Sequence, residues 1–139
     1  MSARVKVGCV RNGELVEVVS VEPSDARPCR LTVFRGGDGG HGVVYSGDNL
    51  FACLLALRRD LERDGLLLCC QGARRDVTSS GMQAQMAGGR YVYKFDRASR
   101  TVNEETVDIL APAGPEDVVS VEEQRAAIFD FYGIRDQSR

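Results

Sequence analysis

A leucine stripe between residues 50 and 61 places the strongest constraint on how this chain can fold. The stripe consists of Leu50, Leu54, Leu57 and Leu61. This spacing puts all four side chains on one face of an α-helix, and an apolar face of that length has to be buried against a core. Asp48 is placed to cap the start of the helix, and Gly65 stands where a left-handed residue commonly ends one. Arg58 and Glu62 follow at the spacing of an exposed ion pair, so the sequence predicts a helix with a buried leucine face and a charged outer face.

Five apolar residues, Leu66–Cys70, follow the helix directly. The run is too short for a helix and is bounded by Gly65 and Gly72, which favours a strand buried on both faces. A strand covered on both faces is usually central in its sheet. We therefore expect residues 66–70 to form a central strand.

Two β-rich runs near the N-terminus, residues 5–10 and 15–19, are separated by Asn12-Gly13. Asn-Gly is the strongest short signal for a β-hairpin, because a type I′ turn needs positive φ at both of its central residues. A third β-rich run covers residues 29–35. The sequence therefore predicts an N-terminal hairpin followed by a third strand.

A polar loop and a short helix are expected after the Leu66–Cys70 run. Residues 73–79 are polar and show no periodicity, which is typical of a loop. Ser80 and Gln83 have the spacing of a capping box, in which each side chain satisfies a backbone donor at the start of a helix. The pair Gly88-Gly89 then predicts the end of this short helix.

Two further elements complete the expected fold. The first is a strand with an aromatic face, formed by Tyr91, Tyr93 and Phe95. The second is a C-terminal helix, because Ser120 and Glu123 have the spacing of a second capping box and an apolar stripe runs from there to Gly133. Residues 134–139 are expected to be frayed.

Strands grouped beside a few helices favour the α+β class. We expect one domain over residues 1–139, long enough for an ordinary core. Its fold is predicted as a single, mostly antiparallel sheet with an N-terminal hairpin, covered by two main helices and one short helix.

The composition is that of a globular protein, since 43% of the 139 residues are hydrophobic and 27% are charged. The longest apolar runs are far shorter than the roughly 20 residues that a membrane span requires. The N-terminus lacks an apolar segment of signal-peptide length. We therefore expect a cytoplasmic protein that does not contact membranes.

The charge pattern argues against nucleic acid as a partner. The net charge is −2, and the acidic residues are concentrated after residue 100. A nucleic-acid-binding surface needs a basic patch, which this acidic segment opposes. A homo-oligomer is compatible with the sequence.

Catalytic and metal-binding patterns are missing from the sequence. The only histidine is His41, and none of the five cysteines is spaced C-x-x-C. We therefore expect buried, reduced thiols and neither a metal nor a cofactor. No nucleophile–base pair can be assembled, and no serine stands in G-x-S-x-G, so the sequence favours a non-catalytic role with no catalytic residues.

A glycine pattern near His41 formally matches the dinucleotide-binding motif. Gly37, Gly39 and Gly42 spell G-x-G-x-x-G after the third expected strand. In a dinucleotide site a helix should start at the third glycine, but β-branched Val43-Val44 follow here instead. The pattern therefore indicates a glycine-rich loop.

The best candidate site consists of Arg74, Arg75, Ser79, Ser80 and Arg90. Two guanidinium groups beside a capped helix N-terminus could hold a carboxylate or a phosphate. In the alternative interpretation, Arg74 and Arg75 pair inside the protein with Asp76 or with the acidic C-terminal segment.

The segment around this site resembles a stretch of small, uncharacterised bacterial single-domain proteins. The resemblance is carried by Gly72-Ala73-Arg74-Arg75-Asp76, Ser80-Gly81-Met82, Gly88-Gly89-Arg90 and Tyr93. It covers roughly a third of the chain, and some of these proteins look like immunity proteins that neutralise a toxin. The resemblance implies a non-catalytic module of the immunity or antitoxin kind that binds another protein. The alternative function is a small-ligand domain or enzyme that uses Arg74 and Arg75 to bind an anionic metabolite or phosphate.

Overall fold

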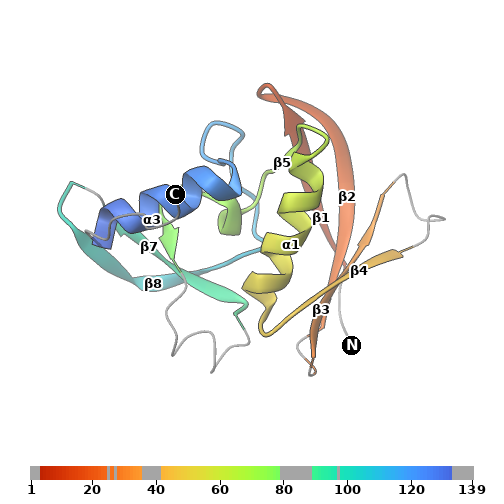
Figure 1. Cartoon of the computed structure of the whole chain (residues 1–139), viewed down its shortest axis with the longest axis horizontal. Coiled ribbons are helices and arrows are strands. Elements are labelled where there is room, and N and C mark those ends of the chain that lie inside the picture. Colours follow the sequence, from red (N-terminus) through yellow and green to blue (C-terminus); the bar gives the residue numbers. More distant parts are fainter. Residues whose placement is uncertain are drawn as a thin grey trace, which may run out of the picture.

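In the part of the chain that the computed structural model describes, there are two antiparallel sheets and two helices (Figure 1), which confirms the α+β class. The described residues are 4–24, 26, 28–35, 42–78, 89–96 and 98–132, with only the backbone of residue 104. The short helix expected from Ser80 and the frayed segment expected over residues 134–139 lie outside the described residues. No helix within these ranges is long and apolar enough to cross a membrane.

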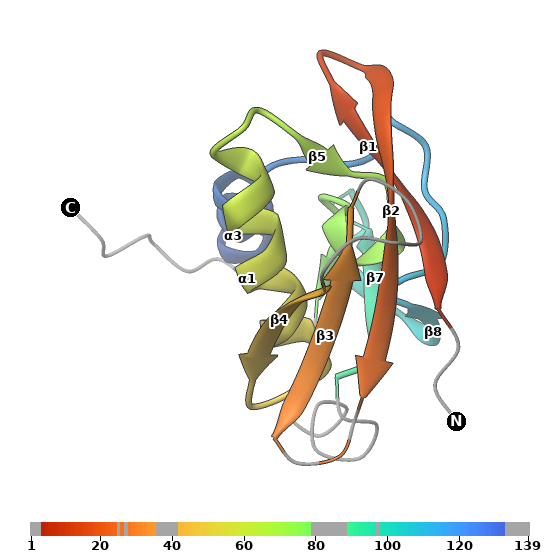
Figure 2. The same ribbon diagram turned by 90° about the vertical axis from the view of Figure 1, so that its right-hand side faces the viewer.

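The larger sheet has five strands in the order β4-β3-β2-β1-β5 (Figure 2). Its strands are β1 (Val5–Arg11), β2 (Glu14–Ser24), β3 (Cys29–Phe34), β4 (Gly42–Gly47) and β5 (Leu67–Leu68). The predicted hairpin of β1 and β2 is confirmed, because Asn12 and Gly13 have φ values of 53° and 80° in the turn between them. Both central residues therefore have the positive φ that a type I′ turn requires.

The strand expected to be central lies at the edge of this sheet. Only Leu67 and Leu68 form β5, which pairs antiparallel with β1 and has no second neighbour among the five strands. Within the Leu66–Cys70 run, side chains alternate between buried and half-buried. The prediction that the Leu66–Cys70 run is buried on both faces is therefore wrong. One face of the run is buried, and its backbone beyond β5 continues into contacts with the segment around Pro112.

The leucine helix is α1 (Leu50–Glu62), which packs against β3, β4 and β5. All four leucines of the stripe are buried, as predicted. The N-cap is Asn49 rather than Asp48, because Asn49 has an extended backbone and its side chain accepts a hydrogen bond from the Ala52 amide at 2.8 Å. Gly65 has φ 75°, as expected after the helix end.

The remaining strands form a second sheet, so the expectation of a single sheet was wrong. This sheet has the order β6-β7-β8 and consists of β6 (Val77–Thr78), β7 (Tyr91–Asp96) and β8 (Thr101–Asp108). A 3₁₀ turn, η1 (Gln71–Ala73), redirects the chain between β5 and β6. Because the chain turns there, β7 pairs with β6 and β8 instead of extending the first sheet.

The aromatic residues of β7 do not share one face. Tyr91 is 40% exposed, whereas Val92 and Phe95 are buried. The pairing register with β8 shifts between Tyr93 and Phe95. Such an irregularity interrupts the strict alternation of side chains, which explains why the two ends of the aromatic pattern face different environments.

Helix α3 (Val121–Tyr132) begins at the capping box expected from the sequence. The Glu123 amide donates to Ser120 Oγ at 3.1 Å, and the Ser120 amide donates to Glu123 Oε1 at 3.3 Å. Its buried residues are Val121, Gln124, Ala127 and Phe131. The Phe131 ring packs on Phe95 of β7 with 4.3 Å between ring centroids, so α3 covers the second sheet.

Candidate functional site

Arg74, from the predicted site, is committed to contacts within the protein. It extends from the segment that follows η1, and its Nε and Nη2 donate to the two carboxylate oxygens of Asp76 at 2.8 and 2.9 Å. Its Nη1 also lies 3.5 Å from the carboxylate of Asp117, just before α3. The hydrogen bond from Arg74 lowers the pKa of Asp76 and raises the pKa of Arg74, so the pair stays ionised. Arg74 therefore ties its own loop to the segment that leads into α3.

The other described residues of the predicted site, Arg75 and Arg90, each pair with a different acidic residue. Arg75 lies 3.4 Å from the Glu123 carboxylate on α3, and its side chain is 49% exposed. Arg90 pairs with Asp108 of β8 at 2.7 Å. Ser79 and Ser80 lie outside the described residues. For Arg74 and Arg75 the structure thus matches the alternative interpretation, in which both arginines pair inside the protein.

Arg58 is a buried arginine that the sequence interpretation placed on the surface. Only 1% of it is exposed, and it donates to Gln124 Oε1 at 2.5 Å and to the Val119 carbonyl at 2.9 Å. Burial lowers its pKa. The expected surface pair with Glu62 was wrong, because residue 58 stands four residues after Leu54 and three before Leu61, on the same face as the leucine stripe. That spacing is the signal from which its burial could have been predicted.

Gln124 extends this buried network from α3 to the loop that carries the arginines. Its Nε2 donates to the carbonyls of Gly72 and Arg74, both at 2.8 Å. Glu62 joins α1 to α3 at a second point, because its carboxylate accepts a hydrogen bond from the Val121 amide at 3.0 Å. Burial raises the pKa of Glu62. The loop that the sequence predicts as a binding site is thus held between α1 and α3.

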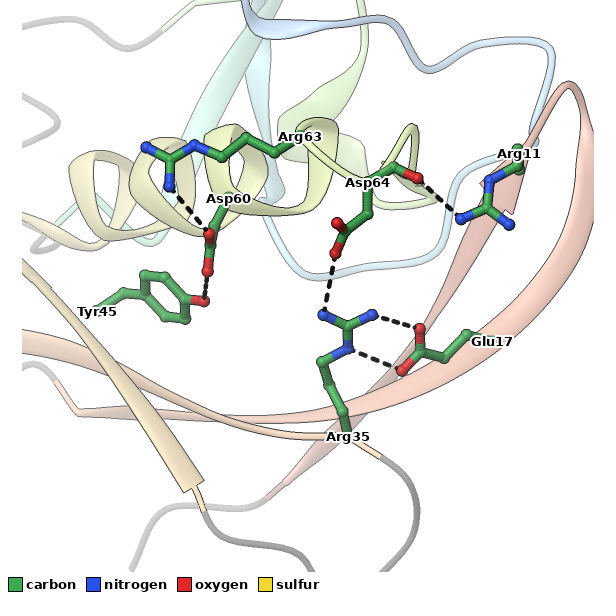
Figure 3. Close-up of polar contacts among 7 residues, drawn as sticks. All are labelled: Arg11, Glu17, Arg35, Tyr45, Asp60, Arg63 and Asp64. Carbon is green, nitrogen blue, oxygen red and sulfur yellow. Dashed lines mark hydrogen bonds and ion pairs between the residues drawn. The ribbon is translucent and has the colours of Figure 1, made fainter.

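A second polar cluster, the rim cluster, joins the five-stranded sheet to the C-terminal half of α1 (Figure 3). It consists of Arg11, Glu17, Arg35, Tyr45, Asp60, Arg63 and Asp64. Arg35 donates to both carboxylate oxygens of Glu17 at 2.9 and 2.8 Å, and this bond lowers the pKa of Glu17. Tyr45 donates to Asp60 at 2.5 Å, and its pKa rises to about 12 because of burial and this carboxylate. The cluster contains three arginines and three carboxylates, so its charges balance.

A hollow of about 550 Å³ lies on the second sheet. It is lined by Asp76, Lys94, Phe95, Asp96, Ala98, Thr101 and Asn103. The hollow is next to the Arg74–Asp76 pair, and the register shift in β7 occurs beside it. Its volume lies in the range of small-molecule sites, and its lining combines one cation with two carboxylates.

An exposed aliphatic surface, the β2 patch, lies on the face of the larger sheet that α1 leaves uncovered. It consists of Leu15, Val16 and Val18, which are 63%, 50% and 49% exposed. Val18 pairs with Gly8, while the neighbouring Val19 is fully buried on the α1 side. A Cβ atom on Gly8 would lie 2.9 Å from Leu15 Cδ1, so the Leu15 side chain lies over this glycine. The Leu15 and Val18 side chains therefore lie together at one end of the sheet's outer face, and the exposed Val16 stands between them in the chain.

The described residues contain no group of three or more metal-ligating side chains. None of the five cysteines forms a disulfide, and Cys69 alone among them is partly exposed. A comparison with protein-family models finds no matching family, and a search of curated proteins finds no match. The function therefore has to be inferred from the geometry of the molecule.

Proposed function

We propose that this chain is a non-catalytic protein-binding module of the bacterial immunity or antitoxin kind that acts in the cytoplasm. The observation that carries the proposal is the β2 patch. Single exposed apolar side chains are common on any protein, whereas a contiguous group is typical of an interaction site. Leu15 and Val18 form such a group on an outer face that no described helix covers, and the exposed Val16 stands between them in the chain.

The surroundings of the β2 patch fit a protein partner. The exposed Lys6 lies on β1 two residues before Gly8, and the exposed Glu14 directly precedes Leu15 on β2. An apolar centre with a polar rim is the usual composition of a protein interface. An exposed outer sheet face of this kind suits a large partner surface better than it suits a small ligand, which needs a concave site.

The arrangement of charges supports a non-catalytic role. In both polar clusters, the carboxylates of Asp76, Glu17 and Asp60 receive hydrogen bonds from arginine or tyrosine. A general base needs a pKa near the working pH and access to substrate. The pKa values of Asp76 and Glu17 are instead lowered by their arginine partners, which weakens both groups as bases.

The test compares the parent protein with a Leu15→Glu/Val18→Glu variant. A partner captured from a lysate of the source organism is identified, purified and titrated against each protein by calorimetry. We expect the variant to bind at least about a hundredfold more weakly, because two charges would enter an apolar interface. Val102→Glu is the matched control, since Val102 is 42% exposed on the second sheet and its substitution should leave the affinity unchanged. Equal affinity of all three proteins would exclude the β2 patch as the binding site.

Binding of a small anionic ligand is the second candidate function, and its candidate place is the hollow on the second sheet, where the carboxylate of Asp76 is already paired with Arg74. Lys94 brings a positive charge to that hollow, and Thr101 and Asn103 bring side-chain hydrogen-bond donors. The partly exposed Arg75 lies elsewhere, beside α3, and offers a further cation. Inorganic phosphate is the probe, and amide chemical shifts are the readout. Saturable shifts over residues 94–103 that disappear in Lys94→Met would support this function, whereas the absence of saturation would contradict it.

A further inference from the structure

We propose that two copies of this chain associate edge to edge through β4, which pairs antiparallel with β4 of the second copy. The unpaired side of a strand presents a row of backbone donors and acceptors that another strand can use. This association is independent of the proposed function, because it uses a sheet edge rather than the face that carries the β2 patch. The partner in the proposal is a second copy of the same chain.

The other three sheet edges in the described structure are protected against such pairing. β5 and β6 are two residues long, and beyond β5 the Ala113 amide donates to the Cys69 carbonyl at 3.1 Å. β8 is longer, but it carries Glu105 and Asp108. Short length, cover by another segment and charged residues are the usual means by which proteins keep sheet edges apart.

Among the described residues, the edge formed by β4 has none of these protections. The strand is six residues long, and its sequence Gly-Val-Val-Tyr-Ser-Gly contains neither a charged residue nor proline. It pairs with β3 on one side and with no described strand on the other. Val43 and Val44 are 51% and 53% exposed. Among the four described edge strands, β4 is thus the longest one that carries no charged residue.

The sequence of β4 is also complementary to itself. In an antiparallel pair of identical strands, residues on the same face stand opposite each other, so the two-fold axis passes through one residue position. With Val44 opposite its own copy, Val43 stands opposite the partner's Tyr45, and both side chains face the α1 side. That assignment follows because Val43 and Tyr45 pair with Val33 and Leu31, which are buried on that side.

The resulting cross-strand contacts are of a favourable kind. A β-branched side chain opposite an aromatic one stabilises antiparallel pairs, and the absence of charge removes like-charge repulsion across the axis. Tyr45 is already held in place by its hydrogen bond to Asp60. Little side-chain freedom is therefore lost when the second copy binds. The product is one continuous sheet made of two five-stranded halves.

A cysteine cross-link tests this register. Residues directly opposite in an antiparallel pair have Cα atoms about 4.5–5.5 Å apart, within the range of a disulfide. We expect Val44→Cys to form a disulfide-linked dimer under mild oxidation. Val43→Cys is the matched control, because two copies of residue 43 are diagonal neighbours and lie beyond easy disulfide reach. Cross-linking of Val43→Cys that equals or exceeds that of Val44→Cys would overturn the proposed register.

Sedimentation equilibrium tests the association itself. The parent protein should dimerise over a concentration series, and Val44→Lys should raise the dissociation constant about tenfold or more, because two lysines would face each other across the axis. Val102→Lys, on the charged edge strand β8, should dimerise like the parent protein. Circular dichroism of each variant shows that it is folded. A parent protein that stays monomeric at every concentration, or a dimer that Val44→Lys leaves unchanged, would overturn the proposal.

Discussion

Arg58 Nη1 and Gln124 Oε1 lie 2.5 Å apart in the interior of the protein, although the two residues are separated by 66 positions in the chain. The guanidinium group also donates to the Val119 carbonyl. The Gln124 amide oxygen and this carbonyl oxygen are both uncharged acceptors. A buried cation is costly unless its donors are satisfied, because it loses its hydration shell. Uncharged oxygen atoms of α3 and of the segment before it accept hydrogen bonds from the guanidinium group. The position of α3 is therefore coupled to a side chain of α1.

Arg58→Ala should destabilise the protein by about 2–5 kcal/mol. The substitution leaves a cavity and removes the donor to the Gln124 side chain and to the carbonyls of Val119 and Gly72. Arg59→Ala is the matched control, since Arg59 is exposed on the same helix and its loss should cost about 0.5 kcal/mol or less. Urea unfolding of both variants measures the difference. Equal losses of stability would contradict the role assigned to the buried arginine.

Leu57→Ala should lower the free energy of unfolding by about 2–5 kcal/mol, because the Leu57 side chain is completely buried in the core. It shares one apolar core with Leu54 and Leu68. Ile128, which the helical pattern of the C-terminal segment also predicts to be in that core, is only partly buried. Ile128→Ala should therefore cost less than Leu57→Ala in the same denaturant titration. A Leu57→Ala loss below about half a kilocalorie would show that the stripe does not form the core.

Arg74→Ala and Arg75→Ala should differ in their effects on stability. Arg74 is 19% exposed and makes two hydrogen bonds to the Asp76 carboxylate, so its loss should cost about 1–3 kcal/mol. Arg75 makes one longer contact and is half exposed, so its loss should cost about 0.5 kcal/mol or less. Thermal and urea unfolding provide the comparison. If both variants are as stable as the parent protein, the internal pairing of Arg74 contributes nothing measurable.

Asp76 should make stability depend on pH in the acid range. Its pKa is lowered below the ordinary value of 3.8 by the hydrogen bond from Arg74. The stabilisation from ionised Asp76 is fully present above the unfolded-state pKa and is lost as the pH falls through the folded-state pKa. The stability difference between the parent protein and Asp76→Asn should thus be constant near neutrality and shrink below pH 3.8. If the stability difference between the two proteins does not change with pH, the charge of the Asp76 carboxylate does not stabilise the folded protein.

The thiols should react in a fixed order. Burial raises the pKa of Cys9 to about 11 and that of Cys70 to about 12, so few of these groups are thiolates at neutral pH. Cys69 is the partly exposed cysteine and should be labelled first by iodoacetamide. Mass spectrometry of tryptic peptides identifies the labelled site, and labelling in denaturant should reach all five. Early labelling of Cys70 in the native protein would contradict the burial described for it.

Local patterns predicted the local parts of the fold. The Asn12-Gly13 turn, the leucine face of α1 and the Ser120 capping box all depend on residues a few positions apart, and each was recognised. The position of β5 depends on pairing between Leu68 and Cys9, which no local pattern encodes. The same limit applies to the predicted site. The sequence shows that Arg74 is a charged residue in a loop, but its contact with Asp117 depends on how distant segments pack.

The strand order has a consequence for synthesis of the chain. β1 to β4 lie side by side in the order in which the ribosome makes them, so each new strand can pair with the strand before it. β5 departs from this order, because it follows α1 and returns to the other side of β1. Until residue 68 has emerged from the ribosome, β1 is an open edge on which a neighbouring nascent chain can pair wrongly. A translational pause between β4 and β5 would lengthen the interval in which β1 has an unpaired edge.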